Sequence, residues 1–148
     1  MSSRQGFTLV ETLIVVVVIS ILSMMALPKF RDAVDRSNLL GARAKVVSSF
    51  ASARATAAGS GRTATLHLGG NTVMVTAKPR FSTGGSGTRD TVVPPYNLST
   101  NYGVTATNTV DSVLIDPTGL PRNASNVALA HGSLKDTIQI NLYGRVLK

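Results

Sequence analysis

Several residue types are scarce or missing in this sequence. It contains no cysteine and no tryptophan, and aromatic residues make up only 5% of its 148 residues. The absence of cysteine excludes disulfide bonds and every cysteine-based metal or nucleophile site. With so few aromatic side chains, a hydrophobic core has to be built from Val, Leu, Ile and Ala.

Negative charge is scarce as well. The chain has 15 Lys and Arg residues against 7 Asp and Glu residues, which gives a net charge of +8. Such a balance suits a solvated basic surface and is also compatible with an anionic partner. The carboxylates show no paired spacing typical of acid–base catalysis, and His67 and His131 stand in different segments. We therefore expect no catalytic residues, no metal site and no cofactor, and hence no enzyme.

The most informative feature that is present is a long apolar run. It extends from Phe7 to Leu27 and contains a single charge, Glu11. As a helix, such a run spans roughly 31 Å, enough to cross the hydrocarbon core of a bilayer. A carboxylate in hydrocarbon costs about 2.5–3.5 kcal/mol even on lenient insertion scales. The run therefore predicts a membrane-spanning helix in which Glu11 needs a partner.

The residues around the run exclude an ordinary secretory signal peptide. Such a signal has an apolar stretch of about 7–15 residues, followed by a cleavage site rich in small residues. Here the stretch is longer, and the segment from Met24 to Pro28 is a poor cleavage site. The small residue, Gly6, precedes the apolar run instead.

A short basic leader ending in Gly6 and followed by Phe-Thr-Leu-Val-Glu resembles the type IV prepilin signal. The resemblance implies that a prepilin peptidase cleaves after Gly6 and methylates the new amino terminus at Phe7. It also implies that Glu11 pairs with the amino terminus of a neighbouring pilin or pseudopilin subunit. Pro28 stands where many members also have proline, and we expect it to kink the helix.

Charge counting and the resemblance disagree about orientation. Lys and Arg normally gather on the cytoplasmic flank of a span, yet the leader holds only Arg4, whereas Lys29 and Arg31 follow the run. We give precedence to the resemblance, because its leader has to face a cytoplasmic peptidase. It implies a single-pass protein of the bacterial inner membrane with a periplasmic C-terminal domain, which later joins a cell-surface or periplasmic filament.

Beyond Pro28 the pattern predicts that the helix continues and becomes amphipathic. Charged residues such as Arg54 fall mainly off its apolar stripe, and the helix should end at the glycines of residues 59–61. The stripe is formed by Phe30, Ala33, Leu40, Val47 and Ala51 and is widened by Val34, Val46 and Phe50.

Alternating segments separated by turn residues follow and predict short antiparallel strands. Residues 62–68 and 73–77 form a hairpin around Gly69-Gly70-Asn71, and further strands are expected at 103–106, 112–115, 126–129, 137–142 and 145–147. The fold class is therefore α+β: a long N-terminal helix, apolar in its first half and amphipathic in its second, packed on a C-terminal antiparallel β-sheet or small sandwich. The expected divisions are a leader at 1–6, a transmembrane or filament-core helix at 7–28, an amphipathic helix at 29–58 and a globular β-rich domain at 59–148.

The last third contains an Asp-Pro-Thr-Gly turn at residues 116–119 and a strand followed by Gly144-Arg145. This ending resembles the GspH/FimT family of minor pseudopilins. Some FimT-like members bind DNA for uptake, which implies Arg145, Lys148 and Arg122 as DNA-binding residues. Cationic side chains at a strand end contact phosphates without reading sequence. Arg80 and Arg89, which flank the glycine-rich segment 82–88, would join them.

Three functions are compatible with these features. The first is a minor pilin or pseudopilin of a type IV pilus or type II secretion filament, assembled through its N-terminal helix after leader cleavage. The second is a DNA-binding minor pilin for natural transformation. The third is a membrane-anchored adaptor outside any filament.

Overall fold

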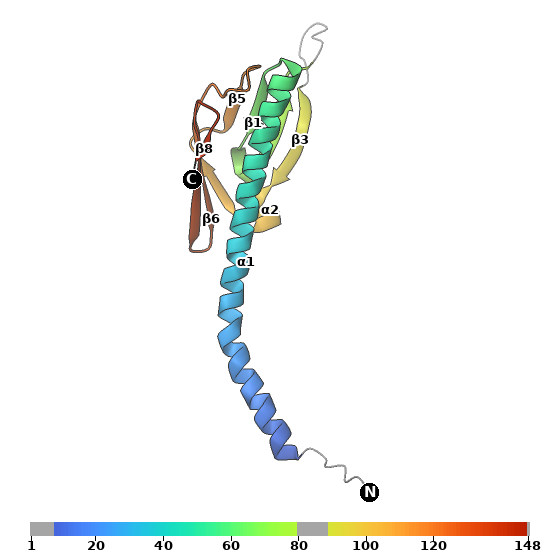
Figure 1. Cartoon of the computed structure of the whole chain (residues 1–148), viewed down its shortest axis with the longest axis vertical. Helices are drawn as coiled ribbons and strands as arrows, with labels where there is room; N and C mark the ends of the chain where they lie inside the picture. Colours follow the sequence, from blue (N-terminus) through green and yellow to red (C-terminus); the bar gives the residue numbers. More distant parts are fainter. Residues whose placement is uncertain (1–7, 80–88, 148) are drawn as a thin grey trace. The chain divides into compact units, whose positions relative to one another are not determined.

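The computed structural model describes residues 8–79 and 89–147 (Figure 1). Gly6, Phe7, Arg80, Lys148 and the glycine-rich segment 82–88 lie outside these residues. In chain order the elements are α1 (Leu9–Ser60), β1 (Ala64–His67), the 3₁₀ helix η1 (Gly69–Asn71), β2 (Thr72–Ala77), β3 (Asp90–Asn97), α2 (Leu98–Tyr102), β4 (Thr105–Asn108), β5 (Ser112–Ile115), β6 (Ser125–His131), β7 (Leu134–Ile140) and β8 (Val146–Leu147).

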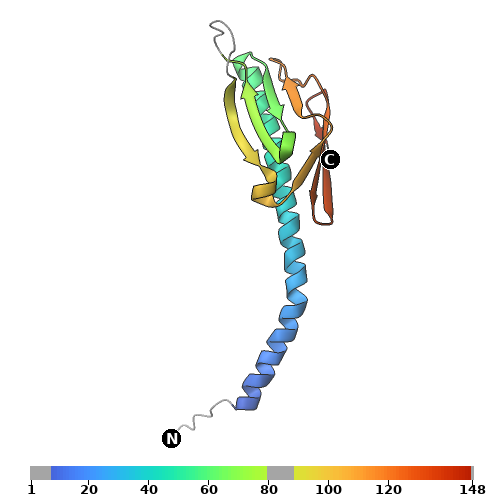
Figure 2. The same ribbon diagram turned by 180° about the vertical axis from the view of Figure 1, so that it is seen from behind.

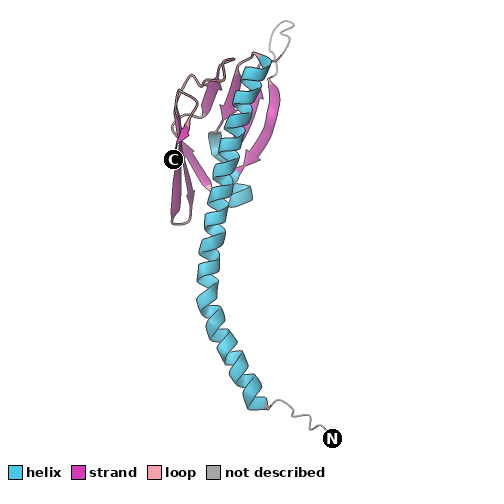
Figure 3. Cartoon of the chain, in the orientation of Figure 1, coloured by secondary structure: helices cyan, strands magenta, loops and turns pink. Residues whose placement is uncertain are grey.

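The chain divides into two compact units, Met1–Val34 and Asp35–Lys148. Helix α1 contributes residues to both units, because the division falls within it. Every described strand belongs to the second unit, as the colouring by secondary structure in Figure 3 shows. The first unit therefore consists, in its described part, of helix alone.

Helix α1 ends at the glycines that predicted its end. Gly61 adopts a left-handed conformation with φ of 64°, and the N–H of Arg62 donates a hydrogen bond to the carbonyl of Ala57 at 3.2 Å. This bond closes the last turn in the manner of a Schellman motif, in which glycine avoids the strain that a side chain would bring. The prediction of the helix end is confirmed.

The second unit contains two four-stranded antiparallel sheets. The strand order is β3-β2-β1-β5 in the first sheet and β4-β6-β7-β8 in the second. The predicted hairpin is present as β1 and β2, in which Leu66 lies opposite Val75. Figures 1 and 2, which view the molecule from opposite sides, show the first sheet covering one face of the second part of α1. The predicted α+β fold with antiparallel sheets is confirmed.

One hydrophobic core joins α1 to both sheets. The strands of the second sheet alternate as the two-residue period of a strand requires. In β6 and β7 the buried apolar side chains are Val127, Leu129, Ile138 and Ile140, and the intervening Asn126, Ala128 and Gln139 are exposed. Leu66 and Ile115 of the first sheet are fully buried in the same core.

The predicted apolar stripe on α1 is correct at its widening members Val46 and Phe50, which are buried. Its centre is wrong by one position, which corresponds to about 100° around the helix. Leu40 and Ala51 are exposed instead of buried. The face that packs on the sheets consists largely of small residues, which let a helix approach a sheet closely, whereas the prediction gave most weight to large side chains. Its buried members are Leu39, Ala42, Val46, Ser49, Phe50, Ala53 and Ala57.

Strand β3 and helix α2 were not predicted, because Pro94 and Pro95 indicate a break. Within the described residues β3 pairs only with β2, so it is an edge strand, where the missing proline N–H groups are tolerated. A register shift in the β2–β3 pairing accommodates them. Helix α2 follows and is capped by Asn97, whose side chain accepts a hydrogen bond from the N–H of Thr100 at 3.0 Å.

Candidate functional site

The N-terminal part of the candidate site begins with a helix cap formed by Thr8. Its hydroxyl accepts a hydrogen bond from the N–H of Glu11 at 3.2 Å, and its carbonyl accepts from the N–H of Thr12 at 3.3 Å. Glu11 is therefore the third residue of the helix. It stands three positions after Thr8, which is the spacing found in a capping box. The sequence reasoning named Glu11 but missed this role of Thr8, which the Thr-x-x-Glu spacing indicates.

The Glu11 carboxylate lies in the first turn of α1. A negative charge is favourable there, because the unsatisfied N–H groups of the first turn carry partial positive charge. Glu11 is exposed, and within residues 8–79 and 89–147 its side chain has neither an ion pair nor a hydrogen bond. The described part of the chain thus leaves this carboxylate available to a partner.

The apolar segment that follows is exposed around its whole circumference. Every large apolar side chain from Leu9 to Leu27 is exposed, with Val16 at 63%. By length and composition, α1 is a helix that could cross a membrane. Pro28 lies inside the helix, which is assigned without interruption. The kink expected at Pro28 stays a prediction.

A separate candidate region, within the second unit, is organised by a residue that was not predicted, Arg54. From α1, its Nε donates to the carbonyl of Gly119 at 2.9 Å, and its Nη1 donates to the carbonyl of Gly144 at 2.8 Å. These glycines belong to the two turns that carry the GspH/FimT resemblance. Arg54 therefore brings together the turns next to Arg122 and Arg145.

Gly144 is required by this arrangement for two reasons. Its φ of 71° lies in the left-handed region, and a Cβ atom added to it would lie only 2.9 Å from Cζ of Arg54. A side chain at this position would be strained and would also push the guanidinium away. Gly144 thus has a packing role beyond that of a simple turn residue.

The predicted cationic residues differ in their partners. Arg122 forms an ion pair with Asp116, which offsets its charge. The side chain of Arg145 is exposed and has no ion pair among the described residues, and its backbone N–H donates to Asn141 at 2.8 Å. Arg89 donates to the hydroxyl of Thr65 on β1. No described contact joins Arg89 to the turn of Arg145, so the structure unites only part of the predicted set.

The two histidines have structural partners. His67 Nε2 lies 2.9 Å from the hydroxyl of Thr76, and burial lowers the pKa of His67. His131, the last residue of β6, contacts both Asp35 and Gly103. In the part of the chain that the structure describes, no three His, Asp or Glu side chains are grouped to hold a metal ion.

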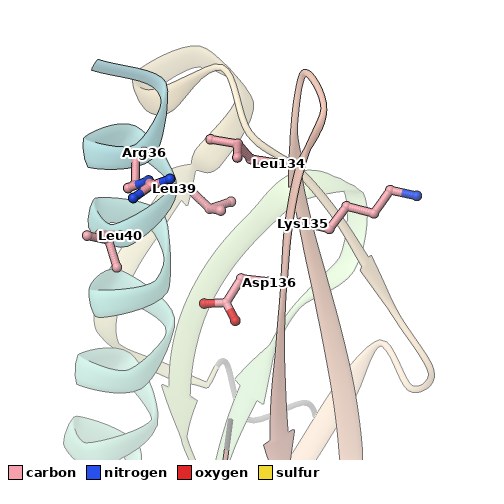
Figure 4. A pocket seen from close by; sticks show the side chains of 6 residues that line it. All are labelled: Arg36, Leu39, Leu40, Leu134, Lys135 and Asp136. Atoms are coloured by element: carbon pink, nitrogen blue, oxygen red, sulfur yellow. The ribbon is translucent and has the colours of Figure 1, made fainter. Parts of the chain in front are cut away.

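A pocket of about 300 Å³ lies between α1 and β7 (Figure 4). The side chains of Leu134 and Asp136 point towards the helix, whereas Lys135 points away from it. Arg43 of α1 bridges to Asp136 with an Nη1–Oδ2 distance of 2.8 Å. Leucine and charged side chains line the pocket together: Arg36, Leu39, Leu40, Leu134, Lys135 and Asp136. It contains no nucleophile beside a base, as a catalytic site would.

The chain thus combines an apolar helix that has a carboxylate in its first turn with a continuation of the same helix that packs on antiparallel sheets. The family model described as "Prokaryotic N-terminal methylation motif" matches residues 1–27. None of the curated proteins matches the chain.

Solved structures show the same fold. The type IV minor pilin FimU of Pseudomonas aeruginosa strain PAO1 is similar in two crystal forms. The form in space group P21 has a TM-score of 0.58 at 15% sequence identity, covering 76% of this chain and 88% of FimU. The form in P65 has a TM-score of 0.53 at 13% identity, covering 73% and 90%. The resemblance to type IV pilin-like proteins is confirmed: the chain carries the methylation motif and has the fold of a minor pilin.

Proposed function

We propose that this chain is a minor pilin or pseudopilin that enters a type IV pilus or type II secretion filament through its N-terminal helix. Cleavage between Gly6 and Phe7 by the prepilin peptidase, followed by methylation of Phe7, precedes assembly. Before assembly the helix spans the inner membrane and the second unit is periplasmic. The observation that carries the proposal is the exposed apolar segment of α1 with Glu11 as its one charge.

The proposal rests on what the apolar segment needs. Its side chains have no partners within the described part of the chain, so they require either lipid or the helices of other subunits. Lipid satisfies the apolar side chains but not Glu11. A neighbouring subunit satisfies both, because its helix packs on the apolar side chains and its amino terminus forms an ion pair with Glu11. Such an ion pair is strong in a medium of low dielectric constant when it is well formed. A lone membrane anchor offers this carboxylate no counter-charge.

The test is a Glu11→Val variant of the full-length protein in the bacterium that produces it. We expect the variant to be cleaved and to remain in the inner membrane, but to be lost from sheared or purified filaments by at least about tenfold. Such a loss follows from removing one partner of a buried ion pair, which typically costs 3–5 kcal/mol. The readouts are membrane fractionation, the mass of the mature amino terminus and the content of the filament fraction.

A matched control is Asp32→Val, which removes another exposed acidic residue from the same helix. We expect this variant to enter filaments as the unmodified protein does. If Glu11→Val enters filaments normally, the proposed assembly role is wrong. If the unmodified protein is cleaved and membrane-bound but never found in filaments, the adaptor alternative is correct.

The choice between pilus and secretion filament follows from which filament fraction contains the protein. DNA binding for natural transformation stays a prediction that rests on Arg145 and Lys148. It is weaker for Arg122, because Asp116 already offsets that charge.

A further inference from the structure

His131 has an unusual set of partners, because both of its ring nitrogens face acceptors. Nδ1 lies 2.8 Å from the carbonyl oxygen of Gly103, and Nε2 lies 3.0 Å from Oδ1 of Asp35. A backbone carbonyl only accepts hydrogen bonds, and so does an ionised carboxylate. A neutral imidazole has one N–H and can donate to only one of the two. Both contacts are hydrogen bonds only when the ring is the doubly protonated cation.

The contacts of His131 join three separate elements of the second unit. His131 ends β6 at the β6–β7 hairpin, Asp35 lies on α1, and Gly103 is the left-handed cap at the end of α2. Gly103 also makes room for the ring, since an added Cβ would lie 2.9 Å from Cε1 of His131. The ring is largely shielded from solvent, with 19% of the side chain exposed. The position therefore acts as a junction between helix and sheet.

A second ion pair fastens the same hairpin to α1 at a different point. Arg43 and Asp136 meet at 2.8 Å, with side chains 22% and 13% exposed. Arginine stays charged at all relevant pH values, so this contact does not respond to protons near neutrality. Of the two described ion pairs between α1 and the hairpin, only that of Asp35 with His131 can be lost near neutral pH, because the imidazole can lose its charge there.

The other ionisable groups on the elements around His131 do not replace Asp35. On β7, Lys135 points away from α1, and Asp136 is already bound by Arg43 (Figure 4). On α1, Arg36 is the next residue after Asp35 and lines the pocket on this side of the helix. On α2, Tyr102 packs against Gly41, and β4 contains no charged residue. The nearest counter-charge for the imidazolium is therefore Asp35.

We propose that His131 is a proton-controlled latch that holds the β6–β7 hairpin and the Gly103 turn on helix α1. When the ring is charged, both contacts are made and the hairpin is fastened at two points. When the ring is neutral, one of the two contacts is lost, and the hairpin is held on α1 by the remaining contact, by Arg43 and Asp136 and by the shared apolar core. This inference does not depend on the proposed filament role.

The sign of the pH dependence follows from the contacts. The Gly103 carbonyl and then Asp35 raise the pKa of His131 above its ordinary value of 6.5. A group whose pKa is raised on folding stabilises the fold fully below the pKa of the unfolded chain, and this contribution is lost as the pH rises through the folded value. The latch is thus closed in mildly acidic solution and opens as the pH rises through the raised pKa of His131.

The test is hydrogen exchange of the full chain in detergent micelles, at about pH 5.5 and about pH 8.5, corrected for the intrinsic pH dependence of exchange. Between these values we expect protection of residues 125–140 to fall by roughly three- to tenfold, because the loss of one hydrogen bond changes local opening on this scale. His131→Gln should abolish this pH dependence. The matched control, His67→Gln, should retain it.

A second variant keeps the test decisive if His131→Gln fails to fold. Asp35→Asn removes the carboxylate but leaves the histidine, and the titration midpoint of His131 followed by NMR should then fall. The proposal is overturned if protection of residues 125–140 in the unmodified protein does not depend on pH. It is overturned equally if His131→Gln loses protection with pH as the unmodified protein does, or if the midpoint of His131 is unchanged in Asp35→Asn.

Discussion

Two valines on the same helix show how different the two units are. Val16 is 63% exposed in the first unit, whereas Val46 is completely buried in the second. The residue type and the local backbone are the same, so neither hydrophobicity nor helix propensity explains the difference. Val46 has two sheets to pack against, and Val16 has no partner in the described chain. The apolar side chains of the first unit therefore need partners beyond the described part of the chain, whereas those of the second unit form a hydrophobic core of their own.

The largest expected effect comes from the core of the second unit. Leu66→Ala removes a fully buried side chain from β1 and should lower the free energy of unfolding by about 2–5 kcal/mol, through lost burial and a cavity. Val16→Ala should change it by less than about 0.5 kcal/mol, because the side chain contributes nothing to this core. Denaturant unfolding of the full chain in micelles measures both. Equal destabilisation by the two variants would contradict the division into two units.

A smaller effect is expected for Arg54, which connects α1 to the two turns of the C-terminal third. Arg54→Met keeps most of the stem but removes the hydrogen bonds to the carbonyls of Gly119 and Gly144. We expect a loss of about 1–3 kcal/mol, because both acceptors lose a charged donor. Arg36→Met, the matched control at an exposed position of the same helix, should be close to neutral. Arg54 has no such connecting role if the two variants unfold alike.

The smallest and most local effect concerns the cap of α1. Thr8→Ala removes the hydroxyl that accepts from the N–H of Glu11, and loss of a cap costs about 0.5–2 kcal/mol of local helix stability. Exchange of the amides of Glu11 and Thr12 should become faster, while unfolding of the second unit stays unchanged. Thr8→Ser keeps the hydroxyl and should behave as the unmodified chain. Unchanged exchange in Thr8→Ala would show that the hydroxyl does not cap the helix.

The parts of the fold that were predicted depend on local rules. The end of α1 at residues 59–61, the β1–β2 hairpin and strand β5 at Ser112–Ile115 follow from glycine conformation and from alternation along the chain. The buried face of α1 could not be placed, because which of two adjacent apolar faces packs depends on how closely the sheets approach. Strand β3 was missed for a related reason: its prolines are tolerated only because it has an edge position.

The candidate functional residues likewise fall into those that the sequence indicates and those that only the structure shows. Glu11 was identified from its chemistry, since a single carboxylate in an apolar run stands out in any fold. Arg54 and His131 were not identified, because each acts through residues more than 25 positions away in the chain. Nothing near Arg54 in the sequence indicates that it binds Gly119 and Gly144, and nothing near His131 indicates Asp35.

By itself the sequence determined that the chain carries an N-terminal methylation motif and where it is apolar, because a motif, a span length and a lone charge are properties of consecutive residues. It also determined the main turns, since glycine and asparagine act within a few positions. Only the tertiary structure decided which helix face is buried, which turns Arg54 joins and which acceptors surround His131. Those contacts connect residues far apart in the chain, and their geometry exists only after α1 and the two sheets have packed together.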